Sequence, residues 1–86
     1  MSEYGDWIAV SVWDVLPEEG IVVGHVMEPY RKWCKENLGP QWNRDNKNLV
    51  WWNDLYGSWY KIHFKKPEDA AAFMLVSGGK RVYEEV

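Results

Sequence analysis

Seven of the 86 residues are tryptophan, and this count limits what the chain can fold into more than any other feature. A domain of this length has one small core, which cannot enclose seven indole rings and satisfy every ring N–H group. Some of the indoles must therefore lie at the surface, where flat aromatic side chains stack on bases, contact a partner protein or close a contact between copies. The sequence thus predicts a binding surface more clearly than a catalytic centre.

The composition is that of one folded domain comprising residues 1–86. Apolar residues make up 47% of the chain and charged residues 27%, which is typical of globular proteins. No apolar run approaches the roughly 20 residues that cross a bilayer, and the first seven residues lack the features of a secretory signal. The single cysteine, Cys34, excludes an internal disulfide and is typical of a reducing compartment. We therefore expect a cytoplasmic protein without a membrane segment.

The charges are unevenly distributed along the chain, although the net charge is only −3. No lysine or arginine precedes Arg31, whereas six acidic residues do, and the basic residues begin in the middle of the chain. An uneven distribution of this kind can orient a partner without an overall basic charge. The acidic first third of the chain favours a basic partner.

Two segments of the first half have clear patterns. Residues 7–13 (WIAVSVW) alternate with period two and predict a strand. Glu28-Pro29 is typical of a helix start, and Gly39-Pro40 of a helix end. The apolar stripe of this helix is Tyr30, Trp33, Cys34 and Leu38. Between these segments, residues 21–23 fit either a short edge strand or an apolar loop.

The second half predicts a hairpin, a helix and a last strand. Residues 49–52 (LVWW) and 59–65 (WYKIHFK) are expected to pair as antiparallel strands. A helix follows from Pro67 to Val76; it is apolar nearly all round, so we expect it to be well buried. Ser77-Gly78-Gly79 ends this helix, and residues 81–86 can form the last strand.

This order predicts an α+β fold of the ferredoxin-like βαββαβ type, with two helices packed on one face of an antiparallel sheet. The face toward the helices is expected to consist of Ile8, Val10, Val12, Tyr60, Ile62 and Phe64. The other face is expected to carry Trp7, Trp13, Trp59, Lys61, His63 and one of Trp51 or Trp52. With Trp42 from a polar loop, the candidate binding residues are Trp7, Trp13, Trp42, Trp52, Trp59, Lys61 and His63.

The sequence contains no recognisable catalytic or metal-binding pattern. Cys34 could pair with His25 or His63 as a nucleophile, but its place on an apolar helix stripe indicates an inert buried thiol. The two histidines do not have HxxxH spacing, and no glycine-rich phosphate loop is present. We therefore expect no enzyme activity, no cofactor and no metal.

One resemblance concerns the strand-to-helix junction FKKPEDAAAFMLVSGG (64–79), which is similar to that of RNA-recognition-motif domains. Such domains stack bases on the aromatic residues of their central strands. Their third-strand signature is matched at Trp59, Ile62 and Phe64, while Lys61 stands where the signature has an aromatic residue. This resemblance implies a single-stranded nucleic-acid binder.

A second resemblance covers residues 28–79. The helix WCKENLGP (33–40), the tryptophan-bearing loop after it and the closing segment 64–79 are similar to small uncharacterised ferredoxin-like proteins of tailed bacteriophages. This resemblance implies a phage-encoded effector in the host cytoplasm that binds and inhibits one host protein or defence complex. Two alternatives remain open: single-stranded nucleic-acid binding through aromatic stacking, and a structural homodimer that covers the open face or an edge of the sheet.

Overall fold

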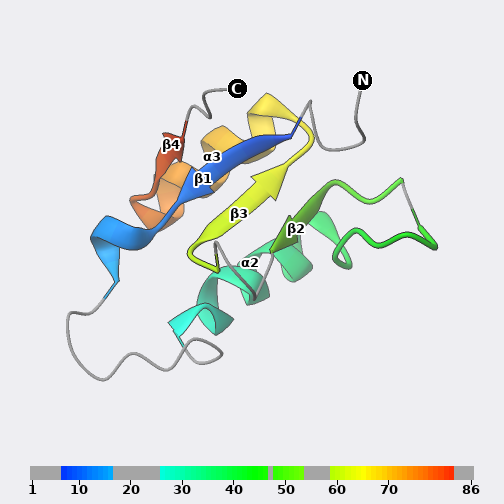
Figure 1. Cartoon of the computed structure of the whole chain (residues 1–86), viewed down its shortest axis with the longest axis horizontal. Coiled ribbons are helices and arrows are strands. Elements are labelled where there is room, and N and C mark those ends of the chain that lie inside the picture. The colour runs from blue at the N-terminus through cyan, green and yellow to red at the C-terminus, as the bar shows by residue number, and fades with distance from the viewer. Residues whose placement is uncertain (1–6, 17–25, 47, 54–58, 83–86) are drawn as a thin grey trace.

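The computed structural model describes residues 7–16, 26–46, 48–53 and 59–82, which form an α+β fold with two α-helices and a four-stranded sheet (Figure 1). The elements are β1 (Ile8–Ser11), the 3₁₀ helix η1 (Trp13–Val15), α2 (Glu28–Leu38), β2 (Trp51–Asn53), β3 (Lys61–Phe64), α3 (Pro67–Ser77) and β4 (Lys80–Val82). The strand order is β2-β3-β1-β4, and every neighbouring pair is antiparallel. The predicted α+β class and antiparallel sheet are confirmed. The predicted segment 21–23 and residues 83–86 of the last strand lie outside the described residues.

Both helices begin and end where proline and glycine predict. Each has a proline in its first turn next to acidic residues, and each is followed by a glycine with positive φ. Gly39 has a φ of 91° and Gly78 a φ of 76°, a conformation that side chains with a Cβ rarely adopt. Within the described part of the chain, no helix is long and apolar enough to cross a membrane.

The helices lie on one side of the sheet, behind the strands in the view of Figure 1, and the core lies between the two layers. Adjacent side chains of a strand point to opposite faces of the sheet. Val10 and Ile62 are register partners that point toward the helices, and both are fully buried. The other fully buried large side chains are Val12, Met27, Cys34, Trp51, Phe64 and Phe73. The predicted inward face is thus confirmed for Val10, Val12, Ile62 and Phe64, and Ile8 packs against the same core.

The inward position predicted for Tyr60 is wrong, and the prediction for its neighbour Trp59 fails for the same reason. The strand begins only at Lys61. Residues 59 and 60 form a turn, in which adjacent side chains need not point to opposite faces of the sheet. Trp59 packs against the core, whereas Tyr60 lies half-buried outside it.

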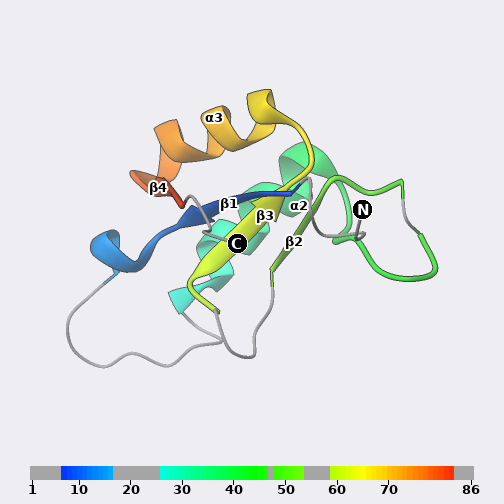
Figure 2. The same cartoon turned by 45° about the horizontal axis from the view of Figure 1, so that its top comes forward.

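The prediction that the second helix is buried nearly all round is also wrong. Ala70 and Phe73 face the core, but Leu75 is 87% exposed and Val76 is 60% exposed. The sheet and α2 contact one side of α3 only, which leaves an apolar outer side (Figure 2).

Gly79 allows the chain to pass from α3 into β4 directly against β1. A Cβ at this position would lie 2.9 Å from the carbonyl oxygen of Ser11 and 3.0 Å from Cγ1 of Val10. Because real Cβ atoms do not approach backbone oxygens so closely, a larger residue would push β4 away from β1. The glycine therefore fixes the edge of the sheet next to η1.

Candidate binding surface

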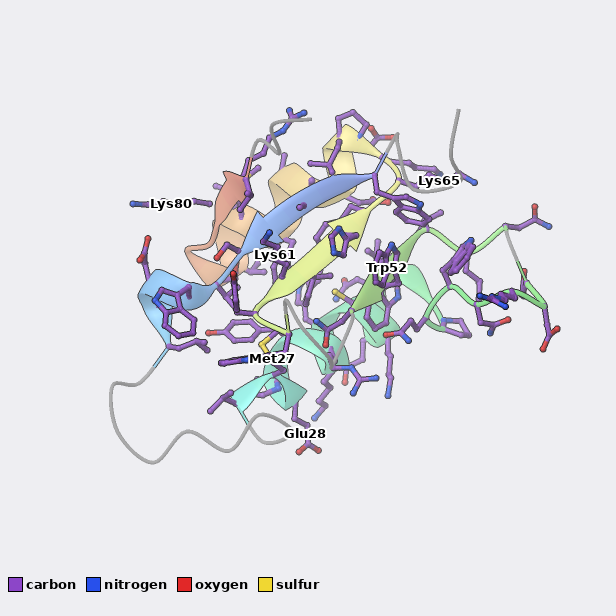
Figure 3. All side chains as sticks on the ribbon, viewed as in Figure 1. Met27, Glu28, Trp52, Lys61, Lys65 and Lys80 are labelled. Atoms are coloured by element: carbon purple, nitrogen blue, oxygen red, sulfur yellow. The ribbon has the colours of Figure 1, made fainter. Side chains whose placement is uncertain are left out.

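The face of the sheet that carries no helix is defined by the register of its strands. One row across this face is Val82, Ala9, His63 and Trp52, and the next is Lys80, Ser11 and Lys61. Trp52 and Lys61 project from this face in Figure 3, from neighbouring strands. We call it the open face, and it holds most of the residues that the sequence singles out.

Three aromatic side chains gather around Trp52 and form with it what we call the Trp52 cluster. Trp52 stacks on His63 with ring centroids 4.1 Å apart and an angle of 13° between the planes. Trp7 meets Trp52 edge to face at 6.5 Å, and Trp7 meets Trp42 in the same way at 6.0 Å. All four side chains are half-buried, and Ala9 in the same row is only 4% exposed. The cluster is therefore a second, small apolar layer on the open face.

The loop that bears Trp42 is held against β2 by backbone hydrogen bonding. The N–H of Trp42 donates to the carbonyl oxygen of Trp51 at 2.8 Å. Farther along the loop, Oδ1 of Asn43 accepts hydrogen bonds from the backbone N–H groups of Asp45 and Asn46. These bonds form an Asx-type turn, which reverses the direction of the chain directly after Trp42.

A second group, the Trp13 cluster, lies before the start of β3. Trp13 of η1 is 55% exposed, and its ring centroid lies 5.8 Å from that of Trp59 and 5.2 Å from that of Tyr60. Trp59 and Tyr60 meet edge to face at 5.7 Å. Such pairs contribute about 0.5–1.5 kcal/mol beyond area burial, so the exposed Trp13 ring is held by its two neighbours.

Lys61 connects the two clusters. Its ammonium nitrogen lies 5.8 Å from the centroid of the Tyr60 ring, within the range of a cation–π contact. His63 of the Trp52 cluster follows two residues later, about 7 Å along the strand. The Trp13 cluster, Lys61 and the Trp52 cluster thus follow one another along the direction of β3.

The strands of the sheet carry basic side chains, although the whole chain has a net charge of −3. The four strands contain Lys61, Lys80 and Arg81 and no acidic residue. Asp14 of η1 lies at the rim, 3.7 Å from the ammonium nitrogen of Lys80. The charged residues within the four strands are therefore all positive.

The structure decides which of the two adjacent tryptophans faces outward. Trp52 lies on the open face, whereas Trp51 is fully buried on the helix side, where its ring N–H donates to the carbonyl oxygen of Gly39 at 2.8 Å. The predicted candidates fall into the two clusters and the lysine between them, with one correction. Trp59 belongs partly to the core and is not a purely outward residue.

The role of Asn53 was not predicted from the sequence. Asn53 ends β2, is 4% exposed and donates from its side-chain amide to the carbonyl oxygens of Trp59 at 3.0 Å and Lys61 at 2.7 Å. Its backbone N–H donates to Oε1 of Gln41 at 3.1 Å. One amide group thus ties β2 to the start of β3, where the Trp13 cluster is built. An asparagine between apolar residues and a glycine reads as a turn, so no local signal predicts this tie.

The described residues contain no group of three histidine, cysteine, aspartate or glutamate side chains that could hold a metal ion. Cys34 lies on the apolar side of α2 and is fully buried. Burial, followed by the negative charge of Asp69, raises the pKa of the Cys34 thiol from 9.0 to about 12. The thiol therefore stays protonated and unreactive at neutral pH.

This pKa shift predicts a loss of stability in alkali. The folded thiol keeps its proton up to a pH of about 12, whereas the unfolded thiol releases it near its ordinary pKa of 9.0. The stabilisation is complete below pH 9 and falls as the pH rises from 9 to 12, by up to about 1.4 kcal/mol per pH unit. Urea unfolding between pH 8 and 11 measures this slope, and the Cys34→Ala variant should show a flatter one. Equal slopes in the two proteins would show that the thiol does not carry the effect.

Comparison of the chain with protein-family models, with curated proteins and with solved structures gives no match.

Proposed function

We propose that this protein binds another protein through the open face of its sheet. The observation that carries the proposal is the arrangement along β3, where the Trp13 cluster and the Trp52 cluster lie on either side of Lys61. Tryptophan and tyrosine are the residues that most often supply the binding energy of protein interfaces. The two clusters would act as anchors and Lys61 as a charged contact between them.

The packing of the rings supports this proposal. Each ring of the two clusters is in stacked, tilted or edge-to-face contact with another aromatic side chain. Rings held in this way lose little conformational entropy when a partner binds, which increases the affinity obtained per contact. The stack of Trp52 on His63 also occupies one face of the indole, which leaves less ring surface for an incoming base.

The charge of the open face points to an acidic partner. Lys61 lies on this face and the exposed Lys65 directly follows the strand, whereas the strands contain no acidic side chain. The expectation that the acidic first third of the chain favours a basic partner stays a prediction, since most of those acidic residues lie outside the described part of the chain. We therefore propose a partner surface that places carboxylates opposite the lysines and apolar groups opposite the rings.

A more specific function is suggested by the strand order of the sheet together with the resemblance to small phage proteins. We propose that the strand order β2-β3-β1-β4 with two helices on one side is the ferredoxin-like arrangement. The resemblance to small tailed-phage proteins then suggests a phage-encoded effector that binds and inhibits a host protein. The surface described above supports binding, and the identity of the partner rests on that resemblance.

The test compares two exposed apolar residues on different sides of the molecule. Tagged wild type, Trp13→Ala and Leu75→Ala are used to capture partners from nuclease-treated bacterial lysate, and the captured protein is then titrated with each variant. We expect Trp13→Ala to weaken binding by about 30-fold or more, as for interface anchors, and to leave the protein folded at the temperature of the assay. Leu75→Ala, on the outer side of α3, should bind like the wild type.

Equal capture by all three proteins would contradict the proposal. Single-stranded nucleic-acid binding is the second candidate, because the strands combine basic and aromatic side chains without acidic ones. It predicts that nuclease removes the captured material and that a fluorescent oligonucleotide binds with a steep dependence on salt. The same Trp13→Ala variant would weaken that binding too, so the nuclease and salt results separate the two functions.

A further inference from the structure

The short helix η1 (Trp13–Val15) is an arch whose two ends are held in the core. Val12 directly before it is fully buried, and Leu16 directly after it packs against the core. Between them, Trp13 is 55% exposed and Val15 is 40% exposed. The arch lies beside the junction of α3 and β4 (Figure 1). The position of the Trp13 ring therefore depends on how the chain leaves β1.

The chain leaves β1 at a backbone N–H group for which β4 offers no partner. The N–H of Val12 donates to the carbonyl oxygen of Tyr60 at 3.0 Å, so antiparallel alternation would direct the N–H of Trp13 toward β4. The register between β1 and β4 extrapolates to Gly78 as the residue opposite Trp13. However, β4 begins only at Lys80, and Gly78 has the left-handed φ of 76° that ends α3. A continued β1 would thus leave this N–H without a strand partner.

The side chain of Ser11 supplies an acceptor in place of that partner. Its Oγ accepts a hydrogen bond from the N–H of Trp13, two residues ahead, at 3.2 Å. A serine hydroxyl that bonds the backbone in this way competes with the strand and favours a turn. Val12, between the two bonded groups, has φ −106° and ψ 12°, which lies outside the strand region. The hydroxyl of Ser11 therefore marks the point at which β1 ends and η1 begins.

The other contacts of η1 constrain Trp13 less directly. The ion pair between Asp14 and Lys80 has a distance of 3.7 Å, and its side chains are 70% and 77% exposed, so it contributes little. Val15 lies over Gly78, where a Cβ atom would come within 3.2 Å of Cγ1 of Val15. This second contact fixes the far end of η1. The bond from Ser11 is the one that reaches the backbone of Trp13 itself.

We propose that Ser11 is a positioning residue for the binding surface, because its hydroxyl sets the place from which the Trp13 ring meets Trp59 and Tyr60. This inference rests on the proposed function, in which Trp13 is an anchor. The ring of Trp13 is inclined by 57° to that of Trp59 and by 66° to that of Tyr60, at 5.8 and 5.2 Å. A rotation of η1 would separate these rings. An anchor that has lost such contacts must be ordered during binding, which lowers the affinity.

Nuclear magnetic resonance of the isotope-labelled full chain tests the positioning without any partner. The seven tryptophans each give an indole N–H signal, and Trp13→Phe identifies that of Trp13. We expect Ser11→Ala to shift this signal and to weaken the Overhauser contacts between the rings of Trp13 and Tyr60. Ser11→Thr keeps the hydroxyl and should keep both. The indole signals of the other tryptophans should stay in place and show that the fold is intact.

Asn43→Ala is the matched control for this measurement. It also removes a side-chain acceptor of a backbone N–H two residues ahead, that of Asp45, but in the loop after Trp42. The contacts between the rings of Trp13 and Tyr60 should be unchanged in this variant. Ring contacts that persist in Ser11→Ala, or that Ser11→Thr does not preserve, would overturn the inference whatever the partner is.

Titration of the captured partner tests the consequence for binding. We expect Ser11→Ala to weaken binding by about fivefold, the effect of one hydrogen bond, and Ser11→Thr to bind like the wild type. In a Trp13→Ala background, Ser11→Ala should weaken binding no further, because the hydroxyl acts through Trp13. Unchanged binding by Ser11→Ala, or an equal loss in both backgrounds, would overturn this role of Ser11. If Trp13→Ala itself bound like the wild type, the proposed function would be wrong, and the ring contacts would still decide whether Ser11 positions Trp13.

Discussion

Replacing Trp51 with alanine is expected to lower the free energy of unfolding by about 3–5 kcal/mol, the largest loss from any single tryptophan. Trp51 is fully buried between the sheet and α2, and it is the largest fully buried side chain among the described residues. Its ring N–H donates to the carbonyl oxygen of Gly39 directly after α2, at 2.8 Å. The substitution therefore opens a cavity at the centre of the core and removes the bond that joins β2 to the end of the helix.

Two further variants separate these contributions. Trp51→Phe keeps much of the apolar volume and loses the hydrogen bond, so a smaller loss of roughly 1–2 kcal/mol is expected. Trp13→Ala removes an indole that is 55% exposed and contacts two other rings, and a loss of roughly 1–2 kcal/mol is expected. Urea unfolding followed by circular dichroism measures all three. Similar losses for Trp51→Ala and Trp13→Ala would show that the assignment of core and surface tryptophans is incorrect.

The sequence predicts those parts of the fold that depend on local signals. Pro29 and Gly39 bound α2, and Pro67 and Gly78 bound α3, because proline at a helix start and glycine after its end act through backbone geometry alone. The alternation of Ile8, Val10 and Val12 identifies the inward face of β1 for a similar reason. In a strand, adjacent side chains point to opposite faces whatever the rest of the chain does.

Features that depend on contacts between elements were not predictable in the same way. The run LVWW is apolar at every position, so only the tertiary structure decides that Trp51 is buried and Trp52 faces outward. The helix α3 is apolar on both sides, and only the positions of the sheet and α2 determine that Leu75 is left exposed. At Trp59 and Tyr60 the strand has not yet begun, so the period-two argument does not apply.

Apart from Tyr60, the residues of the candidate surface were named as candidates from the sequence, but their grouping was not predicted. Strand alternation predicts that Lys61 and His63 lie on the same face of the sheet. The register between β2 and β3 then brings Trp52 beside His63. The positions of Trp42 and Trp13 depend on a loop and on a 3₁₀ turn, whose courses are fixed by long-range contacts. The single most important tie, the side chain of Asn53, reads in the sequence as a turn residue.

Replacing Asn53 with alanine is expected to cost roughly 2–4 kcal/mol of unfolding free energy, because two buried hydrogen bonds are lost together. The side-chain amide of Asn53 donates to the carbonyl oxygens of both Trp59 and Lys61, and the residue is 4% exposed. Without this amide, each of the two oxygens loses one donor in a region that water reaches poorly. The same substitution frees the turn that carries Trp59 and Tyr60, so binding through the Trp13 cluster should weaken as well.

Asn37 provides a matched control with the same chemistry in a different environment. Its side-chain amide also donates to a backbone carbonyl, that of Trp33 at 2.9 Å, but it lies exposed on α2. Asn37→Ala should change the unfolding free energy by no more than about 0.5 kcal/mol, since water replaces the lost donor and alanine favours the helix.

Asn53→Asp keeps the size and hydrogen-bond acceptors of Asn53, but its carboxylate cannot donate to the two carbonyl oxygens. It should therefore be at least as destabilising as Asn53→Ala. Equal changes in unfolding free energy for Asn53→Ala and Asn37→Ala would contradict this prediction. Ring packing alone would then position the Trp13 cluster, and substitutions at Asn53 would not change partner binding.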